Sequence, residues 1–320
     1  MRGIAVAGNI LVDRINEISK YPNVGELTKI LSVKLATGGC VPNVAVDLKR
    51  LSPTLSVYAI GSIGRDSDGE FARSVLEGEG VDTSGVVLKD VDTSFTAVMS
   101  EVGGQRTFFT YPGAGAEFGF DDIDFNRLPD MLHLGYFLLL DKIDSGDGER
   151  ILKTAVERGI KTSIDLVSEN SDRYALVLPC LKYTDNLIIN EVEAGKLAGI
   201  EPTNENLPKI AEKLLELGVR ERVIIHKTEL GVVATREGVT VLGSYELPSG
   251  FIKGTTGAGD AFCAGALLAI YEGLTDKEIL ELGSLAATGA LSAADAISGM
   301  VTREELVAIT KEFKRKEICL

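Results

Sequence analysis

The stretch GTTGAGD, residues 254–260, runs directly into the apolar, alanine-rich segment AFCAGALLAI, residues 261–270. This pattern predicts a glycine-rich turn followed by a helix from Ala258 to Glu272. Small residues at the start of a helix let backbone N–H groups approach an anion where the helix dipole is positive. Asp260, in the first turn, would stay ionised there and could accept a proton from an attacking hydroxyl. Helix capping explains the same residues without any function, because Asp and Gly are both favoured at helix starts.

The residues before this stretch alternate between apolar runs and helical patterns. The runs predict buried strands at Gly3–Gly8, Met131–Gly135, Thr162–Asp165, Asn186–Ile189 and Arg222–His226. Helical spacing is found at Gly148–Arg158 and Asn204–Leu217. Alternation of this kind predicts an α/β fold in which helices cover a parallel sheet. In such sheets ligands bind beyond the carboxyl ends of the strands.

Two β-rich segments interrupt this alternation. They cover Glu26–Ala36 and Asp92–Tyr111, and the second has Gly103 and Gly104 at its middle, as in a hairpin. Together they predict a small sheet separate from the main one. Such a sheet is either a lid over a site or an ordinary edge hairpin. The sequence contains no repeats or proline-rich linkers, so we treat residues 1–320 as a single domain.

A polar, glycine-containing cluster lies near the start of the chain. Asn9 and Asp13 follow the first strand, and the pair Gly38-Gly39 precedes Asn43 and an amphipathic helix predicted over Val44–Leu51. Asp13 and Asn43 could hydrogen-bond to the hydroxyls of a ligand, with the glycines leaving space for a ring. The structural alternative is that Asn43 only caps the helix and that Asp13 is an ordinary loop residue.

A third motif, Asn190-Glu191-Val192-Glu193, follows the predicted strand Asn186–Ile189. Asn followed three residues later by Glu is the pattern of a capping box, which explains both residues structurally. A carboxylate at the end of a strand could instead organise Mg²⁺ and its water shell beside triphosphate oxygens.

Composition limits the classes of partner. The 320 residues are 45% hydrophobic, enough for one large core, and carry a formal net charge of −14. We therefore expect no binding to nucleic acid or to an anionic membrane surface. The basic residues Lys311, Lys314, Arg315 and Lys316 are interpreted as the solvated last turns of a terminal helix.

Cysteine and histidine usage adds two further expectations. The four cysteines share no C-x-x-C spacing and the chain starts on an apolar strand, so we expect a cytoplasmic protein. The apolar runs are too short to span a bilayer. His133 and His226 are the two histidines, and both lie in apolar runs, which argues against a histidine metal site or a Ser-His-Asp triad.

In combination, the motifs become specific. The chain contains GG-x-x-x-N at residues 38–43, N-x-x-E at residues 190–193 and T-G-A-G-D at residues 256–260. In this order it resembles the ribokinase-like (PfkB) carbohydrate kinases over nearly its whole length. The resemblance implies a three-layer α/β/α sandwich with a mostly parallel sheet. It also implies a small β-sheet lid from about residues 14–37 and 91–112, and therefore favours the lid interpretation of the β-rich segments.

The resemblance also implies roles for individual residues. Asp260 would be the catalytic base, and the amides of Gly257, Ala258 and Gly259 would stabilise the phosphoryl group in transfer. Asn190 would hold the phosphates, and Glu193 would bind Mg²⁺ through water. The positions expected to bind the sugar are Asn9, Asp13, Gly38, Gly39 and Asn43, with Arg106 on the lid and Asp141 as further candidates.

The resemblance places ATP against the strand ending at His226 and the helix Ile279–Leu291. Relatives often have T-x-G-x-x-G after that strand, whereas this chain reads HKTELG over residues 226–231. Thr228 and Gly231 are accordingly the nucleotide-binding candidates, and Thr228 is assigned from position.

One departure concerns monovalent cations. Many relatives have Asp where this chain has Gly254, and that Asp contributes to a K⁺ site. The segment Ser292–Val301 is also shorter than the loop that usually completes the site. We therefore expect little K⁺ dependence.

The leading hypothesis is an ATP-dependent kinase for a ribose- or fructose-like sugar. A nucleoside or vitamin-precursor kinase of the same superfamily is the first alternative, although it would need aromatic stacking and the chain has no Trp. The second is a nucleotide-binding regulator without turnover, which would be expected to lack the base or the anion site. A dinucleotide-dependent oxidoreductase is disfavoured, because G-x-G-x-x-G is missing after the first strand. Pairing of lid strands between subunits would give a homodimer.

Overall fold

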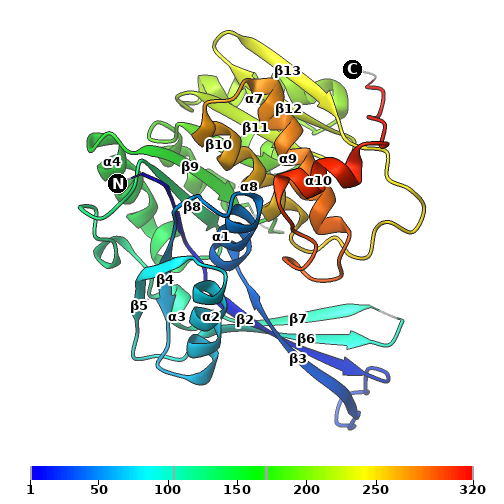
Figure 1. Ribbon diagram of the computed structural model, residues 1–320. Helices are drawn as coiled ribbons and strands as arrows, with labels where there is room; N and C mark the ends of the chain where they lie inside the picture. The colour runs from blue at the N-terminus through cyan, green and yellow to red at the C-terminus, as the bar shows by residue number, and fades with distance from the viewer. Residues whose placement is uncertain (1, 104, 170–171, 319–320) are drawn as a thin grey trace.

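The computed structural model describes residues 2–103, 105–169 and 172–318. Its main feature is a nine-stranded sheet in the order β13-β12-β11-β10-β9-β8-β1-β4-β5 (Figure 1). The strands are β1 (Ile4–Ala7), β4 (Val57–Ile63), β5 (Asp82–Leu88), β8 (Met131–Phe137), β9 (Lys161–Leu166), β10 (Asn186–Asn190), β11 (Arg222–His226), β12 (Leu230–Thr235) and β13 (Gly238–Gly243).

The sheet is mostly parallel, as predicted. Strands from β5 to β11 run parallel to their neighbours, and β12 and β13 are antiparallel additions at one edge. Every residue of β1 is buried, and its side chains alternate between two hydrophobic cores. Ile4 and Val6 belong to one core, and Ala5 and Ala7 belong to the other. A strand buried on both faces reads as an unbroken apolar run, which is why the sequence reveals it.

Helices cover both faces and make a three-layer sandwich (Figure 1). One face carries α1 (Cys40–Leu51), α2 (Ser67–Gly78), α8 (Ala258–Glu272), α9 (Asp276–Leu291) and α10 (Arg303–Thr310). The other carries α4 (Gly148–Glu157), α5 (Leu178–Leu181), α6 (Glu191–Ala198) and α7 (Leu207–Glu216), while the short α3 (Gly113–Ala116) contacts β4. Among the helices in the described part of the chain, none has the length and apolar character needed to cross a bilayer.

A second, four-stranded sheet projects from the body of the molecule (Figure 1). Its order is β3 (Ile30–Gly38), β2 (Leu11–Ile18), β6 (Ser94–Glu101) and β7 (Arg106–Tyr111). The predicted hairpin is confirmed as β6 and β7, and Gly104 lies outside the described residues. The residue pattern did not reveal β2, whose residues Asp13–Glu17 include only one strongly apolar side chain, although the lid bounds that the resemblance implied, about residues 14–37, cover most of it. Asp13 is therefore a strand residue and not a loop residue.

Two other boundaries differ from the prediction. Helix α1 begins at Cys40 instead of Val44, so Asn43 lies inside the helix and Gly39 is its N-cap. Helix α10 ends at Thr310, so the interpretation of Lys314–Lys316 as helical was wrong. These residues form an extended tail in which Arg315 pairs with Tyr245 and the N–H of Lys316 donates to the Ser244 carbonyl oxygen. The backbone of this tail is therefore hydrogen-bonded to residues 244–245 after β13 and does not continue the helix.

Candidate active site

The candidate site lies where strand ends and helix starts converge. The carboxyl ends of β8, β9, β10 and β11 contribute Tyr136, Asp165, Asn190 and His226 to one cavity of about 270 Å³. The amino end of α8 contributes Asp260 to the same cavity. This is the position at which parallel α/β sheets bind ligands, because loops and helix dipoles meet there.

Asp260 is held by two donors from distant parts of the chain. The side-chain amide of Asn43 on α1 donates to Oδ2 at 2.8 Å, and the hydroxyl of Tyr136 on β8 donates to the same oxygen at 3.0 Å. Among the described residues, no hydrogen-bond partner is found for the other oxygen, Oδ1. The carboxylate is thus fixed in orientation while one oxygen stays available.

The environment of Asp260 makes it a proton acceptor near neutral pH. Burial raises its pKa, and the nearby negative charge of Asp165 raises it further. Hydrogen bonds from Asn43 and Tyr136 act in the opposite direction, and the resulting pKa is about 7. A carboxyl group with such a pKa can take up and release a proton under physiological conditions.

Gly257 shapes the turn before Asp260. It is the N-cap of α8 with φ of 78°, a left-handed conformation that favours glycine. A Cβ atom at this position would lie 2.6 Å from Cα of Ala296, so the neighbouring loop also excludes a side chain. The N–H of Ala258 donates to the Thr255 carbonyl oxygen at 3.3 Å, and Gly259 faces both the 270 Å³ cavity and a larger one. The turn therefore separates two cavities.

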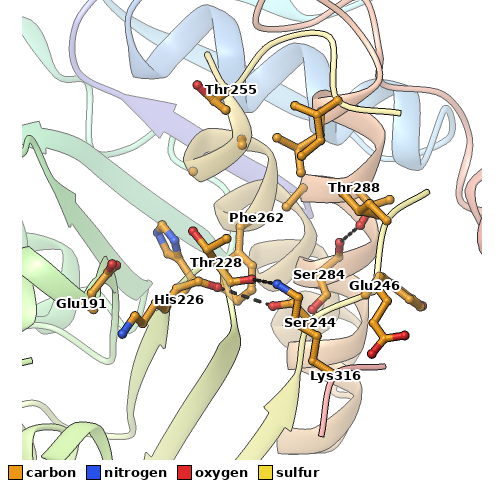
Figure 2. A pocket seen from close by; sticks show the side chains of 18 residues that line it. Glu191, His226, Thr228, Ser244, Glu246, Thr255, Phe262, Ser284, Thr288 and Lys316 are labelled. Carbon is orange, nitrogen blue, oxygen red and sulfur yellow. Dashed lines mark hydrogen bonds between the residues drawn. The ribbon is translucent and has the colours of Figure 1, made fainter. Parts of the chain in front are cut away.

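The larger cavity, of about 680 Å³, lies between β11, α8 and α9 (Figure 2). Its wall includes the rings of His226 and Phe262, which are tilted by 32° relative to one another with centroids 4.8 Å apart. Burial lowers the pKa of His226 to about 4, so this ring is neutral. Ser284 and Thr288 of α9 line the opposite side. The cavity thus occupies the place at which the sequence analysis put the nucleotide.

The motif Asn190–Glu193 forms the predicted capping box and also lines the smaller cavity. The side-chain oxygen of Asn190 accepts from the N–H groups of Val192 (2.9 Å) and Glu193 (3.0 Å). Glu193 accepts from the N–H of Asn190 at 3.1 Å and from the hydroxyl of Ser168 at 2.7 Å. Burial raises the pKa of Glu193 to about 8. Structural and functional interpretations of this motif are therefore compatible.

The front cluster is assembled at the junction of the two sheets. Gly39 has φ of 90°, and a Cβ there would lie 2.5 Å from the carbonyl oxygen of Asn9. A Cβ at Gly38 would lie 2.6 Å from Oδ2 of Asp13, a side-chain atom that can move, so the requirement for glycine is strict only at Gly39. Burial raises the pKa of Asp13 to about 6. Helix α1 begins immediately after Gly39, and Asn43 in its first turn contacts Asp260.

Comparison with known families agrees with this geometry. The model described as pfkB family carbohydrate kinase matches residues 1–303. The chain belongs to the pfkB family of carbohydrate kinases.

Individual relatives of this pfkB chain are distant. Ribokinase of Arabidopsis thaliana is 24% identical over 313 residues, which cover 96% of this chain and 81% of the relative. Adenosine kinase of Saccharomyces cerevisiae is 26% identical over 286 residues, which cover 86% of this chain and 83% of the relative. The solved structure of Arabidopsis thaliana ribokinase complexed with ribose and ATP superposes with a TM-score of 0.84 at 24% identity, over 97% of this chain and 99% of that one. The last comparison shows the shared fold.

Three of the predicted site residues of this pfkB kinase lie apart from Asp260. Arg106 is exposed at the outer end of the β6–β7 hairpin, where it pairs with Ser100. Ser100 lies four residues along β6 from Thr96, which pairs with Asp13. Asp141 is exposed at the start of the helical segment that precedes α4 and does not line either cavity. Gly231 is buried on β12 against Leu280 of α9.

The sequence analysis missed three residues of the site. Tyr136 has φ of 58°, unusual for a non-glycine residue, and its N–H donates to Oδ1 of Asp165 at 2.5 Å. Its position after Gly135 at a strand end was the available signal. Lys316 of the tail lines the larger cavity and donates to the Thr228 carbonyl oxygen at 3.0 Å (Figure 2). Asp165 ended a predicted strand but was not singled out.

Proposed function

We propose that this pfkB kinase transfers the terminal phosphoryl group of ATP to a hydroxyl of a small sugar, with Asp260 as general base. The observation that carries the proposal is the position of Asp260 in the first turn of α8, with two donors on Oδ2 and Oδ1 left available. This carboxyl group lines the smaller cavity and lies beside a helix start that can bind an anion, and the larger cavity lies on the other side of the same turn.

The chemistry then needs little more than positioning. The sugar hydroxyl gives its proton to Oδ1 of Asp260 while its oxygen attacks the terminal phosphorus of ATP. The bond from that phosphorus to the bridging oxygen breaks, and ADP leaves with the electron pair. The amides of Gly257 and Gly259, and that of Ala258 once it leaves the Thr255 carbonyl oxygen, stabilise the charge that accumulates on the phosphoryl oxygens. Holding both reactants in line supplies the remaining acceleration.

Magnesium fits the smaller cavity. Glu193 offers a buried carboxyl group that is not paired with a Lys or Arg among the described residues, and its raised pKa means that a bound cation would favour the ionised form. Hard cations prefer such oxygen ligands. We assign Glu193 to the water shell of Mg²⁺ and Asn190 to the phosphates. When bound, Mg²⁺ would neutralise charge on the phosphates.

We place the adenosine part of ATP in the 680 Å³ cavity. His226 and Phe262 offer apolar ring faces there, and Thr228 is at its edge. Lys316 adds a positive charge from the tail. Gly231 would act indirectly, because its small size lets β12 approach α9 at Leu280.

The sugar would lie between the front cluster and the small sheet. Asn9, Asp13 and Asn43 supply polar groups, Gly38 and Gly39 leave room for a ring, and the sheet would close over it as a lid. Arg106 and Asp141 would need movement of the lid or of their loop to reach the sugar. A ribose- or fructose-like substrate is supported by the family and by the resemblance to ribokinase complexed with ribose and ATP.

A nucleoside or vitamin-precursor kinase is the second candidate, and the similarity to adenosine kinase favours testing it. Such an enzyme would stack its substrate on aromatic rings. Phe95 is already paired with Tyr111 on the small sheet, at 5.3 Å between centroids, and lies under Arg14. Measuring ATP-dependent product formation with pentoses, hexoses, keto-acids and nucleosides distinguishes the candidates, and ATP binding without turnover on any of them would support a regulator.

The base assignment is tested with Asp260→Asn. We expect turnover to fall by about 10²- to 10⁴-fold with ATP affinity little changed, because the amide cannot accept the proton. Asp276→Asn is the matched control, since Asp276 also lies in the first turn of a long helix but outside the site. Near-normal turnover of Asp260→Asn would show that another group is the base.

We also propose that the kinase has little K⁺ dependence. Gly254 has no side chain to contribute, and a Cβ there would lie 2.9 Å from the carbonyl oxygens of both Ala293 and Ala294. The loop therefore occupies the space of a side-chain ligand. Rates are compared in Na⁺ and K⁺ buffers of equal ionic strength, and a severalfold rise in K⁺ would contradict the proposal.

Finally, we propose a cytoplasmic homodimer formed through the small sheet. Cys40, Cys180 and Cys263 are free thiols, which fits a reducing compartment. Cys319 lies outside the described residues. Exposed apolar side chains on the small sheet include Leu35 and Phe109, and a projecting four-stranded sheet gains stability when such a face is covered.

A further inference from the structure

A mixed cluster of metal-ligating side chains lies under the catalytic turn. It consists of His133 on β8, Asp165 at the end of β9 and Cys263 on α8, and all three are buried. His133 Nε2 is 3.5 Å from Oδ2 of Asp165 and 3.6 Å from Sγ of Cys263. The three ligand atoms all lie within 4.8 Å of one another.

We propose that His133, Asp165 and Cys263 form a binding site for a zinc-type divalent ion. Tetrahedral zinc with bonds of about 2.0–2.3 Å to nitrogen, oxygen and sulfur separates adjacent ligand atoms by roughly 3.3–3.7 Å. The two separations that involve His133 fall within this range. The three ligands come from three elements far apart in the sequence, so motif spacing could not reveal the site.

The surrounding hydrogen bonds orient these ligands. Nδ1 of His133 is 3.0 Å from Oγ of Ser163, and donation from Nδ1–H to that oxygen leaves Nε2 as a free lone pair. Oδ1 of Asp165 accepts from the N–H of Tyr136, which leaves Oδ2 to the cluster. Metal-binding histidines and carboxylates are usually held by such outer partners.

The cluster is accessible and chemically distinct from the proposed Mg²⁺ site. Asp165 and Cys263 line the 270 Å³ cavity, so an ion can enter from there and keep its fourth position for water. A sulfur, a nitrogen and an oxygen select zinc-type ions, whereas the oxygens of Glu193 suit magnesium. Binding requires the thiolate, so the Cys263 proton is released to solvent as the sulfur–metal bond forms.

The test is titration of the chelator-treated full-length protein with Co²⁺, which replaces zinc and reports thiolate ligands by a near-ultraviolet absorption. We expect this absorption to saturate at about one ion per chain and to be displaced by Zn²⁺. In Cys263→Ser the absorption should be lost, and in His133→Asn, which keeps the thiol, the affinity for Co²⁺ should fall by about 10-fold or more. Cys180→Ser is the control, because that buried thiol lies on α5 away from the cluster.

The cluster has a metal-free explanation, a hydrogen-bonded network of Ser163, His133, Asp165 and Cys263. Absence of thiolate absorption in the wild-type protein would establish that explanation and overturn the proposal. Unchanged absorption in Cys263→Ser would also overturn it, because the thiolate would then belong to another cysteine. Retained ATP binding shows that each variant is folded, so a lost signal is not confused with unfolding.

Discussion

At the scale of single residues, Tyr136 connects the catalytic base to the sheet. Its N–H binds Asp165 and its hydroxyl binds Asp260, and these two bonds hold it in a left-handed conformation that side chains rarely adopt. Such a conformation costs on the order of 1–3 kcal/mol, which the rest of the fold must offset. Strain of this kind is concentrated at functional sites, which agrees with a positioning role for Tyr136.

We predict that Tyr136→Phe shifts the pH dependence of kcat/KM. The pKa of Asp260 is about 7, so the rate should rise with pH as the base loses its proton. The Tyr136 hydroxyl stabilises the ionised carboxylate, and its loss should raise the pKa and move the acidic limb upward by about 1 pH unit. Tyr271→Phe, at the far end of α8, should leave the limb in place. Identical pH profiles for wild type and Tyr136→Phe would contradict the role.

The residues of the site differ in how well the sequence predicts them. Asp260, Asn190 and Glu193 lie in contiguous motifs whose local structure is sufficient to place them. The contact of Asp260 with Tyr136 joins residues 124 positions apart and depends on the register of the sheet, which no local pattern encodes. Arg106 and Asp141 stay predictions, since their side chains lie outside the cluster in this structure.

At the scale of secondary-structure elements, two helices share one capping arrangement but differ in setting. Glu193 in α6 and Glu305 in α10 both close a capping box at the third helical position. Glu193 lines the smaller cavity, whereas Glu305 is on a peripheral helix. Comparing substitutions of Glu193 and Glu305 therefore distinguishes an effect on helix capping from an effect on magnesium binding.

We predict that Glu193→Gln raises the free Mg²⁺ concentration needed for half-maximal rate by roughly 10-fold. Gln preserves the capping box, so the free energy of unfolding should change little. Glu305→Gln should alter neither quantity. The measurement is the rate as a function of Mg²⁺ at constant ATP, and equal Mg²⁺ requirements for both variants would remove Glu193 from the metal site.

Element boundaries show where local signals suffice. Helix α8 was predicted with the bounds that it has, because a glycine turn precedes it and Gly273 ends it in a left-handed conformation. The residue pattern did not show strand β2, because Asp13–Glu17 lack a clear alternation of apolar and polar side chains. The start of α1 was missed because Gly39, and not Asn43, is the cap.

At the scale of the whole molecule, the small sheet has two different faces. Residues directly opposite one another across strands share a face, so Asp13 lies with Thr96 and Thr110 on one face, the one that we assign to the sugar. Leu35 and Phe109 lie in the neighbouring row, on the opposite face, and are 50% and 59% exposed. One face can thus meet the sugar while the other meets a second copy.

We predict that Phe109→Asp shifts the protein from dimer toward monomer, because it places a charge in the proposed interface. Sedimentation velocity at micromolar concentrations gives the measurement. Val307→Asp on α10 is the control, since Val307 is similarly exposed, at 53%, on another surface. A wild-type protein that sediments as a monomer, or an undiminished dimer of the variant, would rule out assembly through this face.

The order of the chain has a consequence for biosynthesis. Strands β1 to β11 are all complete before the ribosome reaches Gly254, and the catalytic turn, α9 and the tail with Lys316 follow in the final fifth of the chain. The nascent sheet can therefore collapse with the side chains at the carboxyl ends of its strands in place. At that stage it still lacks Asp260 and the wall of the larger cavity that α8 and α9 supply. Competence to bind and use nucleotide should appear only after residues 254–316 have been translated, because these residues supply the proposed base and one wall of the larger cavity.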